Sequence, residues 1–228
     1  MEEAFRLRYK VYCEEKHFLA SADYPNGIEF DEFDDYATHL MVHGRDGSLV
    51  GYMRVLDGSG PQGFPMFAHG LTVHEDFQVP EQGQAVEISR MIVRSDYRHE
   101  FRSTEAGFHA SDLPSPRARN ASDLVQLQLL RETYHHAVRQ GADWVFAAME
   151  PTLHRKFRMM GMPFGPIGPA ADYYGEVRPY AMNLRTMVAT LRERFPETLS
   201  FFDSSSKDPD TTIVRPGEWS HGQFQLAA

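Results

Sequence analysis

One strand-like stretch, Val86–Val93, constrains the fold of this chain more than any other segment. Its ends are apolar and β-branched, which is typical of a buried strand, yet Glu87 and Arg90 stand three residues apart inside it. Charged side chains in a core strand are costly unless they are paired or take part in chemistry. Strict alternation would put Glu87 and Arg90 on opposite faces, so we expect a bulge near Ser89 that brings both into one cleft. A structural ion pair at a sheet edge is the alternative.

Elements of alternating type around this strand predict an α/β domain with a mixed central sheet. The first fifteen residues are predicted to be helical, and Asp46-Gly47 predicts a hairpin turn between two strands. The remaining elements follow from periodicity, caps and breakers. In chain order, we expect strands Thr38–His43 and Leu49–Leu56, a helix from its cap Ser122 to Gln140 with Gly141 as its stop, strand Trp144–Ala148, helix Thr152–Met160, strands Phe164–Ile167 and Arg178–Leu184, and a last helix ending near Arg194.

Two segments lack a regular pattern. The connection from Asp96 to Ala121 is long and has no periodicity, which predicts a lid or a binding loop. From Pro196 onward the chain turns polar, which is typical of a tail or arm. We therefore expect one domain over residues 1–195 and a C-terminal tail or arm over residues 196–228.

Composition excludes several classes of function. The net charge of −9, with no long basic run, argues against a nucleic-acid binder. A single cysteine, Cys13, excludes an internal disulfide and is typical of a reducing compartment. No apolar run approaches the ~18 residues of a membrane span. The start of the sequence lacks the pattern of a signal peptide. We therefore expect a cytoplasmic protein with no transmembrane segment.

Cofactor motifs are also absent from the sequence. There is no Walker loop and no Gly-x-Gly-x-x-Gly fingerprint, so a nucleotide cofactor has no support. The eleven histidines form neither a His-Glu-x-x-His motif nor a Cys/His spacing. We predict no metal and no cofactor.

Four short motifs, in order, resemble the autoinducer-synthase branch of the GNAT-fold acyltransferases. The branch contains acyl-homoserine-lactone synthases, N-acyl amino acid synthases and an acyltransferase group associated with exosortase systems. The resemblance covers nearly all of residues 3–194 and implies a GNAT-like acyl-CoA N-acyltransferase fold. The motifs are Arg8-Tyr9-Lys10-Val11-Tyr12, Glu29-Phe30-Asp31-Glu32-Phe33-Asp34, Val50-Gly51-Tyr52-Met53-Arg54 and Glu87-Ile88-Ser89-Arg90.

The resemblance also implies seven site residues, Arg8, Tyr12, Asp31, Asp34, Arg54, Glu87 and Arg90. To these we add Ser89, Met91, Val93 and Phe67, an aromatic residue that belongs either to the core or to the wall of an apolar substrate tunnel. Glu87, Ser89 and Arg90 are the expected catalytic residues. Tyr12 replaces a usual Phe of the lactone synthases, and Phe18 and Val86 stand where these enzymes often carry Trp. The last two departures count against a lactone synthase without affecting the fold. The expected substrate-binding residues are Arg8, Tyr12, Asp31, Asp34, Arg54, Phe67, Met91 and Val93.

These residue types suit acyl transfer to an amine. A carboxylate, for which we choose Glu87, can take the proton that the attacking amine loses. A bulged strand offers a free backbone N–H to the tetrahedral oxyanion. We expect the cations Arg8, Arg54 and Arg90 to face the anions Asp31, Asp34 and Glu87 and to hold a zwitterionic amino acid. The alternative is a purely structural network that fixes a helix to the sheet.

The acyl donor is predicted to arrive on an acyl-carrier protein. CoA-dependent relatives follow the central strand with a Gly-rich phosphate loop, whereas this chain has the basic run Arg94, Arg98 and Arg102. A local basic surface on an acidic enzyme suits an acidic carrier protein, and acyl-CoA is the less favoured donor. Scattered solubilising charges are the alternative. Further cations that can join this surface are Arg117, Arg119, Arg155, Lys156 and Arg158.

The favoured function is N-acylation of the α-amine of an amino acid by a long-chain acyl-carrier-protein thioester. The second hypothesis is a lactone synthase that uses S-adenosylmethionine as the amine. The third is an inactive GNAT module that binds acyl chains or carrier protein. Related chains have a short strand before the first helix. Either the start of this sequence is truncated, or another segment, for which Thr211–Val214 is a candidate, fills that sheet edge.

Overall fold

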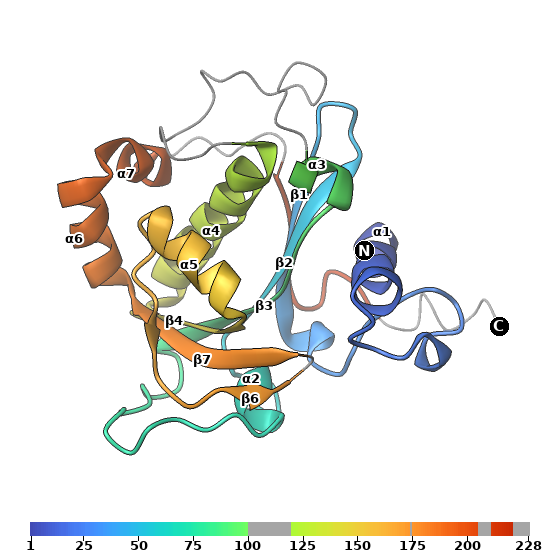
Figure 1. The fold of residues 1–228 in the computed structure, drawn as a ribbon, viewed down its shortest axis with the longest axis horizontal. Helices are drawn as coiled ribbons and strands as arrows, with labels where there is room; N and C mark the ends of the chain where they lie inside the picture. Colours follow the sequence, from blue (N-terminus) through green and yellow to red (C-terminus); the bar gives the residue numbers. More distant parts are fainter. Residues whose placement is uncertain (100–119, 174, 205–210, 221–228) are drawn as a thin grey trace.

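The chain folds around one mixed sheet of eight strands, seen edge-on between its helices in Figure 1. The structure is a computed structural model, and it describes residues 1–99, 120–173, 175–204 and 211–220. The strand order is β5-β7-β4-β3-β2-β1-β8, with β6 paired to β7. All pairs are antiparallel except β3 with β4. The strands are β1 Ala37–His43, β2 Leu49–Leu56, β3 Ala85–Val93, β4 Trp144–Met149, β5 Gly165–Pro166, β6 Ala171–Asp172, β7 Glu176–Asn183 and β8 Thr211–Val214.

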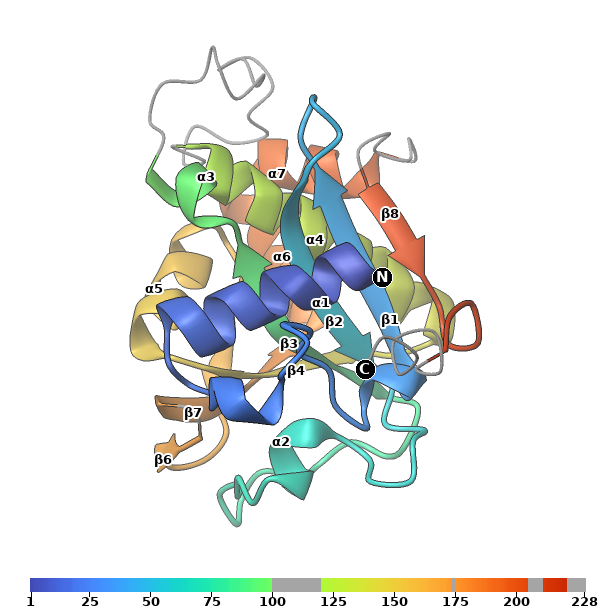
Figure 2. The ribbon, with the colours of Figure 1, turned by 90° about the vertical axis from the view of Figure 1, so that its right-hand side faces the viewer.

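Helices cover both faces of the sheet. Figure 2 shows α1 (Glu2–Tyr9) in front of the sheet and α4 (Ala121–Gln140) behind it. Adjacent residues of β2 therefore enter different cores, because side chains alternate along a strand. Tyr52 packs with residues of α1, and Met53 packs with residues of α4. The other α-helices are α2 Pro65–Ala68, α3 Ser95–His99, α5 Pro151–Met159, α6 Leu184–Arg194 and α7 Pro196–Asp203.

Most expected elements are confirmed, with differences at their ends. The first helix continues from α1 into a π-helical segment, Lys10–Glu15. Helix α4 ends at Gly141, as expected, and Gly141 has a φ of +76° that suits glycine. Its N-cap is Asn120 rather than Ser122, because Asn120 Oδ1 accepts the backbone N–H of Asp123 at 2.9 Å. Ser122 is buried inside the helix instead.

The expected bulge in β3 is confirmed, and it lies at Arg90. Tyr52 pairs with Ile92 and Arg54 pairs with Ser89, so two steps along β2 match three along β3. Arg90 has a φ of +52°, which is uncommon for a residue with a side chain. The parallel pairing of β3 with β4 ends at Ile88 opposite Ala147. Beyond the bulge, β3 therefore has no pairing with β4 among the described residues.

The C-terminal region contributes structure that the tail interpretation did not include. Helix α7 packs on α4 and α6, and Phe202 in it is fully buried. Strand β8 pairs with β1 at the edge where Thr211–Val214 was a candidate. The hydrophobic content of α7 and the β-branched run of β8 account for these contacts, which the polar segment between them obscured. The expected lid at 96–121 lies largely outside the described residues.

Beyond β8, Trp219 is buried against the first helix and β1. Its ring lies 5.1 Å from that of Phe5 and 5.4 Å from that of His39, both edge to face. Such contacts between aromatic rings add to the free energy of burial. Trp219 therefore packs into the same part of the core as the first helix.

We therefore expect Trp219→Ala to destabilise the whole domain. Removing a buried Trp costs about 3–5 kcal/mol through lost burial and a cavity, which corresponds to a fall in Tm of roughly 6–20 °C in a chain of this size. Thermal unfolding followed by circular dichroism measures it. Glu218→Ala is the control, because Glu218 pairs with Arg215 only on the surface. Equal Tm values for the two variants would contradict the packing role.

Candidate active site

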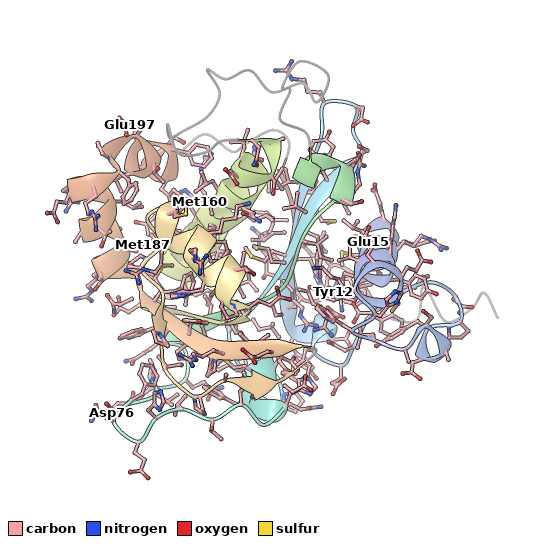
Figure 3. The ribbon with its side chains drawn as sticks, in the orientation of Figure 1. Tyr12, Glu15, Asp76, Met160, Met187 and Glu197 are labelled. Atoms are coloured by element: carbon pink, nitrogen blue, oxygen red, sulfur yellow. The ribbon has the colours of Figure 1, made fainter. Side chains whose placement is uncertain are left out.

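A cavity of about 440 Å³ opens where β3 and β4 part. Strand β3 lines it from Glu87 to Val93, and β4 lines it from Ala147 to Met149. The first helix lines it with Tyr12, which Figure 3 shows between that helix and the sheet. Helices α4 and α5 line it from the opposite face of the sheet. Because the strands part, residues from both faces of the sheet line this cavity.

Behind one wall of the cavity lies a closed ring of ion pairs. Going round the ring, each arginine contacts two carboxylates and each carboxylate contacts two arginines, so three cations balance three anions. We call this set the ion-pair ring. Its N–O distances are Arg8–Glu29 2.5 Å, Glu29–Arg90 3.3 Å, Arg90–Asp31 3.2 Å, Asp31–Arg54 2.5 Å, Arg54–Asp34 3.0 Å and Asp34–Arg8 2.6 Å.

Four segments of the chain meet in the ion-pair ring: the first helix, the acidic segment 29–34, β2 and β3. The side chains of Arg8, Glu29 and Asp34 are fully buried, and those of Arg90 and Asp31 are 8% and 15% exposed. Burial alone would raise the pKa values of these carboxyl groups. The adjacent guanidinium groups outweigh this effect of burial and hold the pKa values of Glu29, Asp31 and Asp34 below their usual range. All six groups are therefore charged at neutral pH.

Tyr52 and His39 connect the ring to the sheet. Arg8 Nη1 donates to Tyr52 Oη at 3.2 Å. Burial lowers the pKa of His39 to about 4, so its ring is neutral. One ring nitrogen of His39 contacts the carbonyl oxygen of Asp34, so it carries the proton, and the other accepts from Tyr52 Oη at 2.7 Å. Through the hydrogen bond from His39 to its carbonyl oxygen, this chain holds the backbone of Asp34 in place.

Glu87 lies outside the ring, which corrects the expected set of anions. Its two carboxyl oxygens accept the backbone N–H of Met66 at 3.1 and 3.2 Å, and no arginine side chain bonds to it among the described residues. The expected position is taken by Glu29. Burial raises the pKa of Glu87 to about 8, against the opposing effects of the Met66 N–H and Arg54. Glu87 is therefore a largely protonated acid at neutral pH, on the floor of the cavity.

The bulge brings catalytic candidates to one wall. Arg54 Nε donates to Ser89 Oγ at 2.9 Å, so Ser89 faces the ring, and Arg90 turns to the same side to reach Glu29 and Asp31. The Arg90 guanidinium carbon also lies 5.3 Å from the ring centre of Tyr12. The predicted site residues that line the cavity are Tyr12, Glu87, Ser89, Arg90, Met91 and Val93.

Several predicted substrate-binding residues lie away from the cavity. Arg8, Asp31, Asp34 and Arg54 belong to the ring behind it and do not line the cavity. Phe67 packs its ring 6.3 Å from Phe64 and 5.9 Å from Phe146 in a separate apolar cluster. Phe67 is part of α2 and packs, partly buried, against this cluster.

The structure gives Arg94, the first residue of the basic run predicted to bind the carrier protein, partners within the fold. Arg94 pairs with Asp96 at 2.8 Å and donates to Ser48 Oγ and the Leu49 carbonyl, so it joins β2 to α3 instead of facing solvent freely. The side chains of Arg98 and Arg102 lie outside the described residues, and so do Arg117 and Arg119. Arg155 and Arg158 on α5 are exposed and make no ion pair with a described residue.

Sequence reasoning missed two charged residues of this region. Glu29 belongs to the acidic motif of residues 29–34, but the spacing of residues in this motif does not indicate that Glu29 is fully buried. Lys16 lines the mouth of the cavity beside Phe18 and has no ionic partner among the described residues. No helix in the described part of the chain is long and apolar enough to cross a membrane. The described residues also contain no cluster of three metal-binding side chains.

Comparisons with known proteins agree with this geometry. A family model described as an acetyltransferase (GNAT) domain matches residues 7–104, which is less than half of the chain. No curated protein sequence matches. TofI, solved in a ternary complex with an inhibitor and MTA, is similar in structure, with a TM-score of 0.59 and 20% identity over 84% of this chain and 88% of TofI.

Two further solved structures have comparable similarity. BjaI, a CoA-dependent acyl-homoserine lactone synthase solved with SAM and isopentyl-CoA, gives a TM-score of 0.56 and 22% identity over 84% of this chain and 80% of BjaI. The AHL synthase LasI gives 0.56 and 20% over 83% of this chain and 86% of LasI. The expected GNAT fold and the resemblance to autoinducer synthases are confirmed. The matched acetyltransferase domain confirms the expected acyltransferase class.

Opening the ion-pair ring should destabilise the protein strongly. Asp34→Asn keeps the shape of the side chain but leaves Arg8 and Arg54 each short of one anion in a buried site. Breaking a buried pair costs about 3–5 kcal/mol, which urea denaturation measures as a lower midpoint. Asp35→Asn is the control, because Asp35 is the exposed neighbour. If both variants unfold at the same urea concentration, the ring does not stabilise the fold.

Proposed function

We propose that this protein transfers an acyl group from a carrier-protein thioester to the α-amine of an amino acid. The observation that carries the proposal is the cavity between the parted strands, which the catalytic candidates Glu87 and Arg90 line together with residues from both faces of the sheet. An acceptor that enters beside the first helix and a donor that enters beside α4 and α5 meet there. No cofactor is needed for this reaction.

The acceptor side of the cavity has one cation without an ionic partner among the described residues, Lys16, whereas the charge of Arg90 is balanced in the ion-pair ring. Arg90 and Lys16 line it near Tyr12 and Phe18. Arg90 is held by Glu29 and Asp31, so its position is fixed before a ligand arrives. A carboxylate is the group that such a wall recognises, which supports a free amino acid rather than a peptide-bound amine.

The chemistry requires one base and one oxyanion donor. The amine nitrogen attacks the thioester carbonyl, the C–N bond forms, and the amine loses a proton to Glu87, directly or through water. The backbone N–H groups of β3 beyond Ile88, on the side that β4 has left, support the oxyanion. The C–S bond then breaks and the thiolate takes a proton. Because the pKa of Glu87 is about 8, its basic form and the rate should increase up to that pH.

The donor side has the character that a fatty acyl thioester needs. Met91, Val93, Leu153 and Phe157 supply an apolar lining to the cavity. Exposed Arg155 and Arg158 lie on the same helix as the lining residues Leu153 and Phe157. An acidic carrier protein docked on these arginines would sit next to the entrance, with charge complementarity that favours association.

The deciding experiment offers the enzyme an acyl-carrier-protein thioester together with the common amino acids and S-adenosylmethionine, and identifies products by mass spectrometry. We expect an N-acyl amino acid, with the matched acyl-CoA as a poor donor. An acyl-homoserine lactone would show the lactone synthase that the sequence also allows. Binding of the acyl carrier without any product would show an inactive module.

Glu87→Gln tests the assigned base. Gln keeps the shape and an acceptor for the Met66 N–H but cannot take a proton, so turnover should fall by roughly 10²–10⁴. The fold should persist, because the ring does not include Glu87. Glu32→Gln is the control, since Glu32 is exposed and its side chain bonds only to Gln62 among the described residues. Near-normal turnover of Glu87→Gln across the pH range would reject this role.

A further inference from the structure

Tyr52 on β2 holds Arg8 from the sheet. Arg8 Nη1 donates to Asp34 Oδ1 at 2.6 Å and to Tyr52 Oη at 3.2 Å, whereas its Nη2 has no hydrogen-bond partner among the described residues. The other acceptors of Arg8 belong to the acidic segment 29–34, so Tyr52 is the acceptor that ties this guanidinium to the sheet. Neither Tyr52 nor His39, to which its hydroxyl bonds, takes part in the proposed chemistry.

His39 on β1 sets the direction of the Tyr52 hydroxyl. Its ring is fully buried and neutral, and Nε2 carries the proton that it donates to the carbonyl oxygen of Asp34 at 3.1 Å. Nδ1 is therefore an acceptor, and the Tyr52 O–H donates to it at 2.7 Å. With its hydrogen directed at His39, the oxygen of Tyr52 presents its lone pairs to Arg8.

Glu29 passes the orientation of Arg8 on to Arg90. One carboxyl oxygen of Glu29 accepts from Arg8 Nε at 2.5 Å, and the other accepts from Arg90 Nε and Nη2 at 3.4 and 3.3 Å. The contacts to Arg90 are near the upper limit for a hydrogen bond, so a small rotation of the carboxylate breaks them. Arg90 lines the cavity, whereas Arg8 and Tyr52 do not. A change at Tyr52 therefore reaches the cavity through the ring.

We propose that the hydrogen bond between His39 and Tyr52 positions Arg90 for the acceptor. The kinetic part of this inference rests on the proposed function. Tyr52 and His39 are positioning residues, because they touch neither the cavity nor the reacting atoms. They restrict the orientation of Arg8 before a ligand arrives, so the acceptor does not have to order the ring when it binds.

Two substitutions of His39 separate its two hydrogen bonds. His39→Asn places an amide oxygen near the position of Nδ1, so it keeps the acceptor for Tyr52 and loses the bond to Asp34. His39→Gln places an amide nitrogen near the position of Nε2, so it keeps the bond to Asp34 and loses the acceptor for Tyr52. Tyr52→Phe removes the hydroxyl itself. If Tyr52→Phe does not fold, the two variants of His39 give the same comparison.

The kinetic test measures KM for the amino acid acceptor. Tyr52→Phe and His39→Gln should raise this KM about 3–10-fold, the value of one ordinary hydrogen bond, and change kcat less than about twofold. His39→Asn should keep KM within about twofold of the wild type, even where it lowers Tm. Tyr180→Phe is the control, because Tyr180 is a buried tyrosine of β7 that does not line the cavity. Equal KM values for the two His39 variants, or an unchanged KM in Tyr52→Phe, overturn the proposal.

A spectroscopic test needs no substrate and separates this inference from the proposed function. The Nε–H group of Arg90 gives its own proton–nitrogen NMR signal, which is assigned by its disappearance in Arg90→Lys. We expect this signal to shift in Tyr52→Phe and in His39→Gln, and to keep its wild-type position in His39→Asn. These shifts in a protein that transfers no acyl group would uphold the positioning and reject the function. An unmoved Arg90 signal in Tyr52→Phe and His39→Gln would reject the positioning even if acyl transfer is confirmed.

Discussion

The ion-pair ring, a closed set of six charged side chains, joins the segments that meet beside the cavity. Burying an ion costs several kcal/mol unless its partners repay the lost hydration. Here each arginine contacts two carboxylates and each carboxylate two arginines, so no member is left with an unmatched charge. The ring ties the first helix and the acidic segment to β2 and β3. It also determines where Arg90 stands, which is the one ring member that lines the cavity.

The bulge at Arg90 links that ring to the geometry of the reaction. It turns Arg90 toward the carboxylates and coincides with the point where β3 leaves β4. One distortion of a single strand therefore opens the sheet and fixes the cation beside the opening. Glu87, three residues earlier, stays outside the ring and keeps its proton near neutral pH because it is buried and no arginine side chain bonds to it among the described residues. The side chains of Glu29 and Glu87 are thus buried to a similar extent but have opposite protonation states. Glu29 contacts two arginines, whereas Glu87 forms no ion pair among the described residues.

Much of this was predictable from local sequence. Glu87 and Arg90 inside an apolar strand indicated a bulge, and the motif residues identified most members of the ring. The pairing of Glu29 in place of Glu87 was not predictable, because both are acids within the recognised motifs and only the three-dimensional packing decides which reaches an arginine. Phe67 was assigned to the cavity by its apolar character, which core and tunnel residues share. Trp219 gave no signal of its partner Phe5, which lies 214 residues earlier in the chain, whereas the β-branched run Thr211–Val214 did indicate a strand for the sheet edge.

The protonation state of Glu87 is the most direct test of this account, and it can be measured without knowing any substrate. Infrared difference spectroscopy across a pH titration reports the carboxylic acid C=O band of a buried acid. We expect a band that disappears near pH 8 in the wild type and is missing in Glu87→Gln. If every carboxyl group of the folded protein is ionised by pH 6, Glu87 is an ordinary paired carboxylate and the proposed base, with its separation from the ion-pair ring, is wrong.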